Sequence, residues 1–393
     1  MTGVPTVRVG REMPRHDALA RSGLEVLAAG QVPSGALVAA PTFPVYRYGW
    51  LRDGAFCALA LDAAGRAEAA GAFHRWVAET ILSRRELVAA AIRAVQGGRT
   101  DPPYLPARYT LSGEREPESD RPWPNFQLDG YGTWLYALAW HVGGSDLAAE
   151  PSADLREAAW LTAAYLSAMW NVPCHDCWEE TGDGHHTSTL LAVTSGLSAA
   201  ARLLGKGSTV GGYDFDQVAG QISAVLVDRH TVDGRLTRSR TDQRVDASLL
   251  WAGAPFEVPG ITDTDLVRNT VEAVRSQLLV PGGGVRRYLG DSYYGGGEWL
   301  LATSWLGWHA VLVGDRPLAE HCDRWVREQS TAKGWLPEQV TARPQFPDLV
   351  ADWIRRLGPV ATPLLWSHAM QIIQSAAMTQ AGWPVDRSAT WSS

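Results

Sequence analysis

The sequence FDQVAGQISAVL at residues 215–226 decides the fold class. Its apolar residues Phe215, Val218, Ile222, Val225 and Leu226 recur at the spacing of one helix face. The same pattern predicts further helices near 15–29, 54–63, 66–81, 84–95, 130–142, 153–169, 188–204, 262–278, 298–313, 316–328 and 363–380. Glycine and proline clusters separate these segments, which indicates helices joined by loops.

About a dozen predicted helices favour a closed ring over a stack of repeats. A solenoid has a fixed repeat period, and none is visible in this chain. Strand patterns are short and few, for example near 37–39, and no linker divides the chain. We therefore expect an all-α toroid of helical hairpins in one domain over residues 1–393, with residues 1–12 as an N-terminal extension. The loops of such a ring gather at one end and can line a pocket.

The composition excludes several classes of partner. The 393 residues carry a formal net charge of -7 and no basic run, which argues against nucleic acid or an anionic membrane. We see no membrane-spanning apolar run and no signal peptide, and four cysteines are too few for a disulfide scaffold, so we expect a cytoplasmic protein. Several of the 18 tryptophans stand beside acids and glycines, where an indole face can stack on a sugar.

The first stretch with chemistry is residues 174–180 (CHDCWEE), which places Trp178 beside Glu179 and Glu180. An apolar indole raises the pKa of a neighbouring carboxyl group and can keep it protonated as a general acid. The alternative is a solvated pair of glutamates, which is the commoner setting. On this stretch alone a solvated pair of glutamates is favoured. The other loops of the chain shift the interpretation toward a general acid.

The same stretch contains a possible metal motif. Cys174 and Cys177 have the spacing of zinc ligands, and His175, His185 and His186 are near in sequence. The other two cysteines do not form a second pair at ligand spacing, so buried free thiols are favoured over a zinc site. We expect neither a metal nor another cofactor, and a zinc hydrolase stays as a third hypothesis.

Two further loops precede predicted helices and combine aromatic and charged side chains. Residues 46–54 (YRYGWLRDG) place a guanidinium and a carboxylate beside two aromatic rings, which suits a ring of sugar hydroxyls. Residues 121–130 (RPWPNFQLDG) hold Trp123 in a proline-rich turn, a good place for a platform. Asp53 and Asp129 can also be simple helix N-caps.

The C-terminal half supplies the remaining candidates. Residues 286–299 (RRYLGDSYYGGGEW) interleave aromatic rings with charges, as in a polar pocket wall, and lack the glycine spacing of a phosphate loop. Residues 334–339 (GWLPEQ) place the Glu338 carboxylate in a loop behind Trp335. His368 is interpreted as a hydrogen-bonded structural histidine before a catalytic one.

Together these loops resemble glycoside hydrolase family 15, the glucoamylase family, over roughly residues 43–368. Motifs similar to those of the family occur in the same order. They are residues 48–53 (YGWLRD), 123–129 (WPNFQLD), 176–180 (DCWEE), 287–299 (RYLGDSYYGGGEW) and 338–339 (EQ). One such motif is weak evidence, whereas five in order are strong.

The resemblance implies a fold and a mechanism. It implies an (α/α)6 barrel and an inverting reaction, with Glu179 as general acid and Glu338 as general base. Tyr48 would position the base or steady the oxocarbenium-like centre. The implied sugar-binding residues are Trp50, Arg52, Asp53, Trp123, Asp129, Trp178, Glu180, Arg287, Tyr293 and Trp335.

The resemblance also narrows the substrate. This chain shows neither the β-sandwich nor the starch-binding module of larger family members, so we expect a short imported oligosaccharide and glucose as its partners. Its size and layout resemble family members that cleave isomaltose, an α-1,6 disaccharide, with β-glucose released from the non-reducing end. A family trehalase or another α-glucosidase is the alternative. A non-catalytic sugar-binding helical protein is the alternative of another class.

Overall fold

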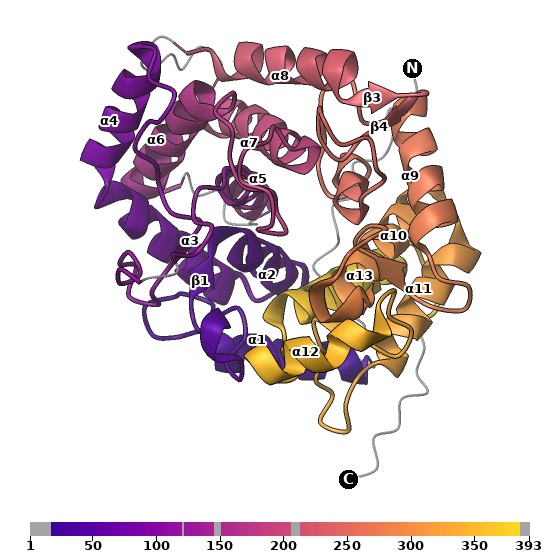
Figure 1. The fold of residues 1–393 in the computed structure, drawn as a ribbon. Coiled ribbons are helices and arrows are strands. Elements are labelled where there is room, and N and C mark those ends of the chain that lie inside the picture. Colours follow the sequence, from indigo (N-terminus) through magenta and orange to yellow (C-terminus); the bar gives the residue numbers. More distant parts are fainter. Residues whose placement is uncertain (1–16, 120–121, 145–150, 206–212, 386–393) are drawn as a thin grey trace.

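The chain forms a closed ring of helices in two layers (Figure 1). This computed structural model describes residues 17–119, 122–144, 151–205 and 213–385. Each inner element contacts the next around the ring, and the last contacts the first. In order, the inner elements are α2 (Leu51–Ala63), α5 (Asp129–Gly144), α7 (Thr187–Leu204), η2 (Ala247–Ala252), α10 (Leu300–Val313) and α13 (Leu365–Gln380).

A second layer of helices surrounds this ring, one against each inner element. Its members are α1 (Ala18–Gly30), α3 (Ala67–Leu82), α6 (Ala153–Met169), α8 (Phe215–Arg229), α9 (Asp265–Leu278) and α11 (Arg316–Glu328). The expected (α/α)6 barrel is therefore confirmed. Two helices stand outside the scheme: α4 (Arg85–Gln96) packs on α6, and α12 (Pro347–Leu357) packs on η3 (Tyr293–Gly295).

The two layers differ in how their residues are buried. Every residue of α2 is buried, because an inner helix contacts neighbours on all sides. In the outer helix α8, Phe215, Val218, Ile222 and Leu226 are buried and Val225 is half-buried, as one apolar face predicts. All twelve helices expected from the sequence are present, whereas α12 was not predicted.

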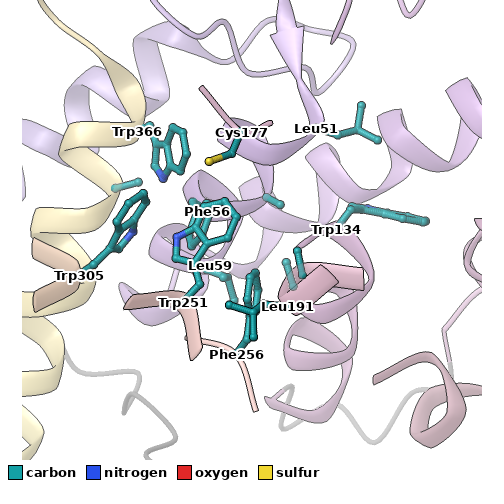
Figure 2. Close-up of a cluster of buried hydrophobic side chains, with 14 of the residues drawn as sticks. Leu51, Phe56, Leu59, Trp134, Cys177, Leu191, Trp251, Phe256, Trp305 and Trp366 are labelled. Atoms are coloured by element: carbon teal, nitrogen blue, oxygen red, sulfur yellow. The ribbon is translucent and has the colours of Figure 1, made fainter. Parts of the chain in front are cut away.

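Aromatic side chains from the inner elements pack together in a buried cluster (Figure 2). Phe56 of α2 stacks on Trp366 of α13 with ring centroids 5.2 Å apart, and Trp305 of α10 lies 5.7 Å from Trp366. Trp251 lies 5.4 Å from Trp305 and comes from η2, a short 3-10 helix that takes the place of an inner α-helix. Trp366 also lines the cavity described below, so this cluster supports one part of the cavity wall.

A close helix crossing between α5 and α7 depends on two glycines. A Cβ atom on Gly132 would lie 2.3 Å from the carbonyl oxygen of Ala192, and one on Gly196 would lie 2.5 Å from the Gly132 oxygen. Real atoms cannot approach so closely, so the two backbones touch only because both side chains are absent. The crossing fixes α5, whose first residue, Asp129, contributes to the site described below.

Short strands align the loops at one end of the barrel. β1 (Gly49–Trp50) pairs with β2 (Arg108–Tyr109), and β3 (Thr231–Val232) pairs with β4 (Arg235–Leu236). β6 (Glu298–Trp299) lies between β5 (Val285–Arg286) and β7 (Gln339–Val340). The last sheet joins the loop after Arg286 to the loop that ends at residue 338.

Three remaining expectations concern the ends and the edges of the fold. The strand pattern near 37–39 gives only an isolated bridge between Gln31 and Leu37, so that strand prediction is wrong. The proposed extension over residues 1–12 lies outside the described residues. Among the helices of the described segments, none combines the length and apolar character needed to cross a membrane.

Candidate active site

The loops at one end of the inner ring surround a cavity of about 370 Å³. Most of the residues proposed from the sequence line it. They are Trp50, Arg52, Asp53, Trp123, Trp178, Glu179, Glu180, Arg287, Tyr293 and Glu338. Tyr48, Asp129 and Trp335 are not among the lining residues. The motifs that are far apart in the sequence thus meet at one site.

Glu179 lies against the β1–α2 segment, which contributes Trp50 and Arg52 to the cavity. Its Oε1 accepts hydrogen bonds of 2.8 Å from the Trp50 indole and from the Gln127 amide. The Arg52 guanidinium lies 3.6 Å from the same oxygen. All of these contacts hold one carboxylate oxygen, which fixes the orientation of the group toward the cavity.

A tight turn places Glu179 in this position. Its φ is +66°, a left-handed conformation that is uncommon for a residue other than glycine. The backbone N–H of Glu179 donates to the Asp176 carbonyl at 2.9 Å, and the buried Asp176 carboxylate accepts from the N–H groups of Glu180 and Thr181. Arg238 donates to the same carboxylate at 2.8 Å. Asp176 therefore organises the turn that presents the glutamate.

Glu338 has a different environment. Only 4% of it is exposed, and the Tyr46 hydroxyl donates to its Oε1 at 3.1 Å. Its Oε2 is buried and has no hydrogen-bond partner among the described residues. Burial raises the pKa of this carboxyl group to about 7, while Arg287 and the tyrosine hydroxyls act to lower it.

The structure corrects the role given to Tyr48. The Tyr48 ring faces the Arg108 guanidinium at 4.3 Å and lies edge-on to Trp50, and Tyr48 does not line the cavity. The hydroxyl that contacts Glu338 belongs to Tyr46, which also bonds the Tyr293 hydroxyl at 2.9 Å. Both tyrosines stand in the same motif, and their spacing alone gave no reason to prefer Tyr46.

A buried network fixes Arg52. Its Nη1 donates to Gln127 at 2.8 Å and to Asp129 at 2.9 Å. Asp129 is completely buried, so it positions Arg52 instead of touching a ligand in the cavity. The adjacent Asp53 lies inside the first turn of α2, whose N-cap residue is Trp50, so the simple capping role is wrong for Asp53. Burial raises the pKa of Asp53 to about 7.

Arg287 also lines the cavity and belongs to a second ionic network. Its side chain is buried and donates to Asp291 at 2.6 and 2.8 Å and to Glu180 at 2.7 Å. The Tyr288 hydroxyl donates to the other oxygen of Glu180. The Arg287 guanidinium also lies 5.2 Å from the Trp178 ring. The pairing leaves Glu180 fixed at the edge of the cavity with one third of its side chain exposed.

The tryptophans divide into two groups. Trp123 lines the cavity, and the Arg108 guanidinium covers its other side at 3.9 Å from the ring centre. Trp335 does not line the cavity, and the Lys333 ammonium lies 4.7 Å from the Trp335 ring. This position does not support the proposed contact between Trp335 and sugar. Sequence analysis also missed Trp353 and Leu357 of α12, which line the cavity.

A signal for α12 was present in the sequence. Pro347 stands at its first turn, and Val350, Trp353, Ile354 and Leu357 follow at helical spacing. No comparable signal identifies Tyr46, because its partner is distant in the chain. Gln127, another missed residue, was quoted in the family motif without a role of its own.

The CxxC segment has the features of buried thiols. Burial raises the pKa of Cys174 to about 12 and that of Cys177 well above its ordinary value, as expected of thiols enclosed by protein. The Ser188 hydroxyl contacts the Cys177 sulfur at 3.6 Å. Among the described residues, this segment contains no cluster of three metal-ligating groups. The structural interpretation of His368 is supported, because its Nε2 accepts from the Leu336 N–H at 2.9 Å.

Carboxyl groups, guanidinium groups and aromatic platforms around one cavity in an (α/α)6 barrel are typical of enzymes that cleave glycosides. The chain matches the model of Glycosyl hydrolases family 15 over residues 13–387 and belongs to this family. It is therefore a glycoside hydrolase.

Individual relatives refine the comparison. The chain is 39% identical to an isomaltose glucohydrolase of Kribbella flavida over 92% of its length and 93% of that protein. It is similar to the structure of a glutamate-to-alanine variant of a glycosidase in complex with glucose, with a TM-score of 0.84 and 36% identity, covering 96% and 98% of the two chains. A trehalase of Mycolicibacterium smegmatis is 26% identical over 79% of this chain and 49% of that protein.

Proposed function

We propose that this protein is an inverting, exo-acting α-glucosidase that hydrolyses isomaltose to β-glucose and glucose. The observation that carries the proposal is the contrast between two carboxyl groups in one cavity. Glu179 is held at one oxygen by Trp50 and Gln127, whereas Glu338 has a buried oxygen without a protein partner. Such an acceptor suits a water molecule, because buried polar groups are otherwise hydrogen-bonded.

The reaction follows from these positions. Glu179 donates a proton to the glycosidic oxygen while the bond from that oxygen to C1 breaks. A water molecule held by Oε2 of Glu338 attacks C1 from the opposite face, and Glu338 takes the proton that the water loses. The leaving sugar departs with its new hydroxyl group, and inversion at C1 gives β-glucose. Tyr46 orients Glu338 through its 3.1 Å hydrogen bond.

The remaining residues bind the sugar rings. Arg52 and Asp53 face the cavity beside Glu179, where they can bond the hydroxyls of the non-reducing glucose. Arg287, which also lines the cavity, can assist, and Trp178 with Glu180 bounds the space for the leaving sugar. A cavity of about 370 Å³ is near the lower end of ligand pockets, which favours a disaccharide over a polymer.

The choice of isomaltose is supported by the 39% identical relative, whose length this chain covers almost completely. Trehalase is the second candidate within the same mechanism, supported by the more distant relative. We further propose that residues 1–393 form one catalytic domain that acts on short sugars in the cytoplasm. Limited proteolysis and cell fractionation test those two points.

Proton NMR of the purified protein with isomaltose, maltose and trehalose tests the function directly. We expect the anomeric signal of β-glucose to appear first, and to appear fastest from isomaltose. Early α-glucose would overturn the inverting roles of Glu179 and Glu338. Rapid hydrolysis of trehalose alone would reassign the linkage. Saturable sugar binding without hydrolysis would support the non-catalytic alternative.

A further inference from the structure

Three metal-ligating side chains meet far from the catalytic cavity. Asp62 ends α2, His74 lies on the outer helix α3, and His141 lies near the end of α5. One donor atom of each residue lies within 4.8 Å of the donors of the other two. None of the three lines the cavity that holds Glu179 and Glu338. The cluster therefore has no part in the proposed reaction.

Asp62 and His141 already form a contact between two inner helices. The Nδ1 atom of His141 lies 2.8 and 2.9 Å from the two carboxylate oxygens of Asp62. The same two helices are joined at their other ends by Arg52 and Asp129 in the active site. The contact between Asp62 and His141 thus joins α2 and α5 at one end, and the contact between Arg52 and Asp129 joins them at the end that carries the catalytic cavity.

His74 is the unexplained member of the group. It is completely buried, and neither of its ring nitrogens has a hydrogen-bond partner among the described residues. Its ring lies 4.9 Å from the His141 ring. Buried polar groups without partners are uncommon, because the water they lose is not replaced.

We propose that Asp62, His74 and His141 bind one zinc ion that joins α2, α3 and α5. Two imidazoles and one carboxylate are ligands that zinc accepts, with a water molecule in the fourth position. Magnesium and calcium prefer sites made of oxygen atoms alone. Ligand atoms of tetrahedral zinc lie roughly 3.3 Å apart, so zinc binding requires His74 to approach and the 2.8 Å contact between Asp62 and His141 to lengthen.

One positively charged side chain lies beside the proposed zinc site. Arg75 is exposed, and its guanidinium and the Nε2 of His141 both lie next to Gly71. A cation at this place opposes binding of a second cation. Replacing Arg75 with alanine is therefore expected to tighten zinc binding without touching a ligand.

Thermal unfolding of the tag-free, metal-stripped protein tests the proposal. We expect zinc at about 100 times its dissociation constant to raise Tm by several degrees, and magnesium to have no effect. His74→Ala and Asp62→Asn are expected to abolish the shift, and Arg75→Ala to increase it at the same free zinc concentration. His185→Ala, a histidine near the CxxC segment, is the matched control and keeps the shift.

Cobalt binding provides a second measurement that does not depend on stable variants. The wild-type protein should bind one equivalent of cobalt with the visible spectrum of a nitrogen and oxygen site, and without a thiolate charge-transfer band. A thiolate band would place the metal at Cys174 and Cys177 and overturn the proposal. An absent zinc shift, or one that persists in His74→Ala, would do so as well.

Discussion

The two carboxyl groups proposed as acid and base differ in the groups that surround them. Glu179 is bonded by an indole and an amide, and a guanidinium lies 3.6 Å away. Glu338 has one tyrosine hydroxyl and one oxygen without a protein partner. Fixed donors orient Glu179, whereas Glu338 keeps one acceptor oxygen that a water molecule can bond.

This difference explains how one cavity can assign two roles to the same residue type. A general acid must aim its proton at a bond fixed in the substrate, so a rigid orientation helps it. A general base that acts through water needs a free acceptor and an orienting contact on its other oxygen. Tyr46 supplies that contact. Four predictions test this contrast.

The largest effect is expected for Glu179→Gln. Loss of the proton donor should lower kcat for isomaltose by roughly 10³- to 10⁴-fold. Cleavage of α-glucosyl fluoride should fall much less, because fluoride leaves without needing a proton. Steady-state kinetics with both substrates measure the contrast, and circular dichroism checks folding. An equal loss with the two substrates would mean that Glu179 is not the acid.

Glu338→Ala is expected to lose roughly 10²- to 10³-fold in kcat for both substrates, because each needs an activated water. Azide should restore part of the rate and give β-glucosyl azide, since the small anion can occupy the vacated space. Product analysis by NMR identifies that compound. Full activity in the variant, or an α-glucosyl azide, would contradict the base role.

A smaller effect separates the two tyrosines. Tyr46→Phe removes a hydrogen bond to a carboxylate, worth about 1.5–3 kcal/mol, so kcat/KM should fall about 10- to 100-fold. Tyr48→Phe is the matched control and should change kcat/KM by less than about threefold, because Tyr48 makes no contact with Glu338. The opposite order would restore Tyr48 as the positioning residue.

The sequence predicted the fold better than it predicted contacts across the cavity. The helix periodicity gave the inner and outer helices, because burial on one face repeats every few residues. It missed η2, since Ala247–Ala252 is too short to show a period. The quoted motifs contained most of the lining residues, because loops before the inner helices all face the same end of the ring.

What the sequence could not supply was the direction of individual side chains. Tyr46 and Tyr48 are close in the chain, and only the short 3-10 helix Pro44–Tyr46 turns the first toward Glu338. Trp335 lies close to Glu338 in sequence, yet its ring faces Lys333. Such directions depend on contacts between distant segments, which spacing within one motif does not contain.

The smallest predicted effect is a shift in the pH profile. Burial raises the pKa of Glu338 to about 7, so the base is protonated and inactive below that value. We therefore expect kcat/KM to rise with pH through an apparent pKa near 7, falling about tenfold per unit below it. Asp53, also raised to about 7, is coupled to Glu338, so the observed value belongs to both groups.

The hydrogen bond from Tyr46 lowers the pKa of Glu338, because it stabilises the carboxylate. Tyr46→Phe should therefore move the acidic limb of kcat/KM to higher pH, in addition to lowering its maximum. Tyr48→Phe should leave the limb in place. A limb that Tyr46→Phe does not move would mean that another group controls it. In that case the contrast between Glu179 and Glu338 would rest on geometry alone.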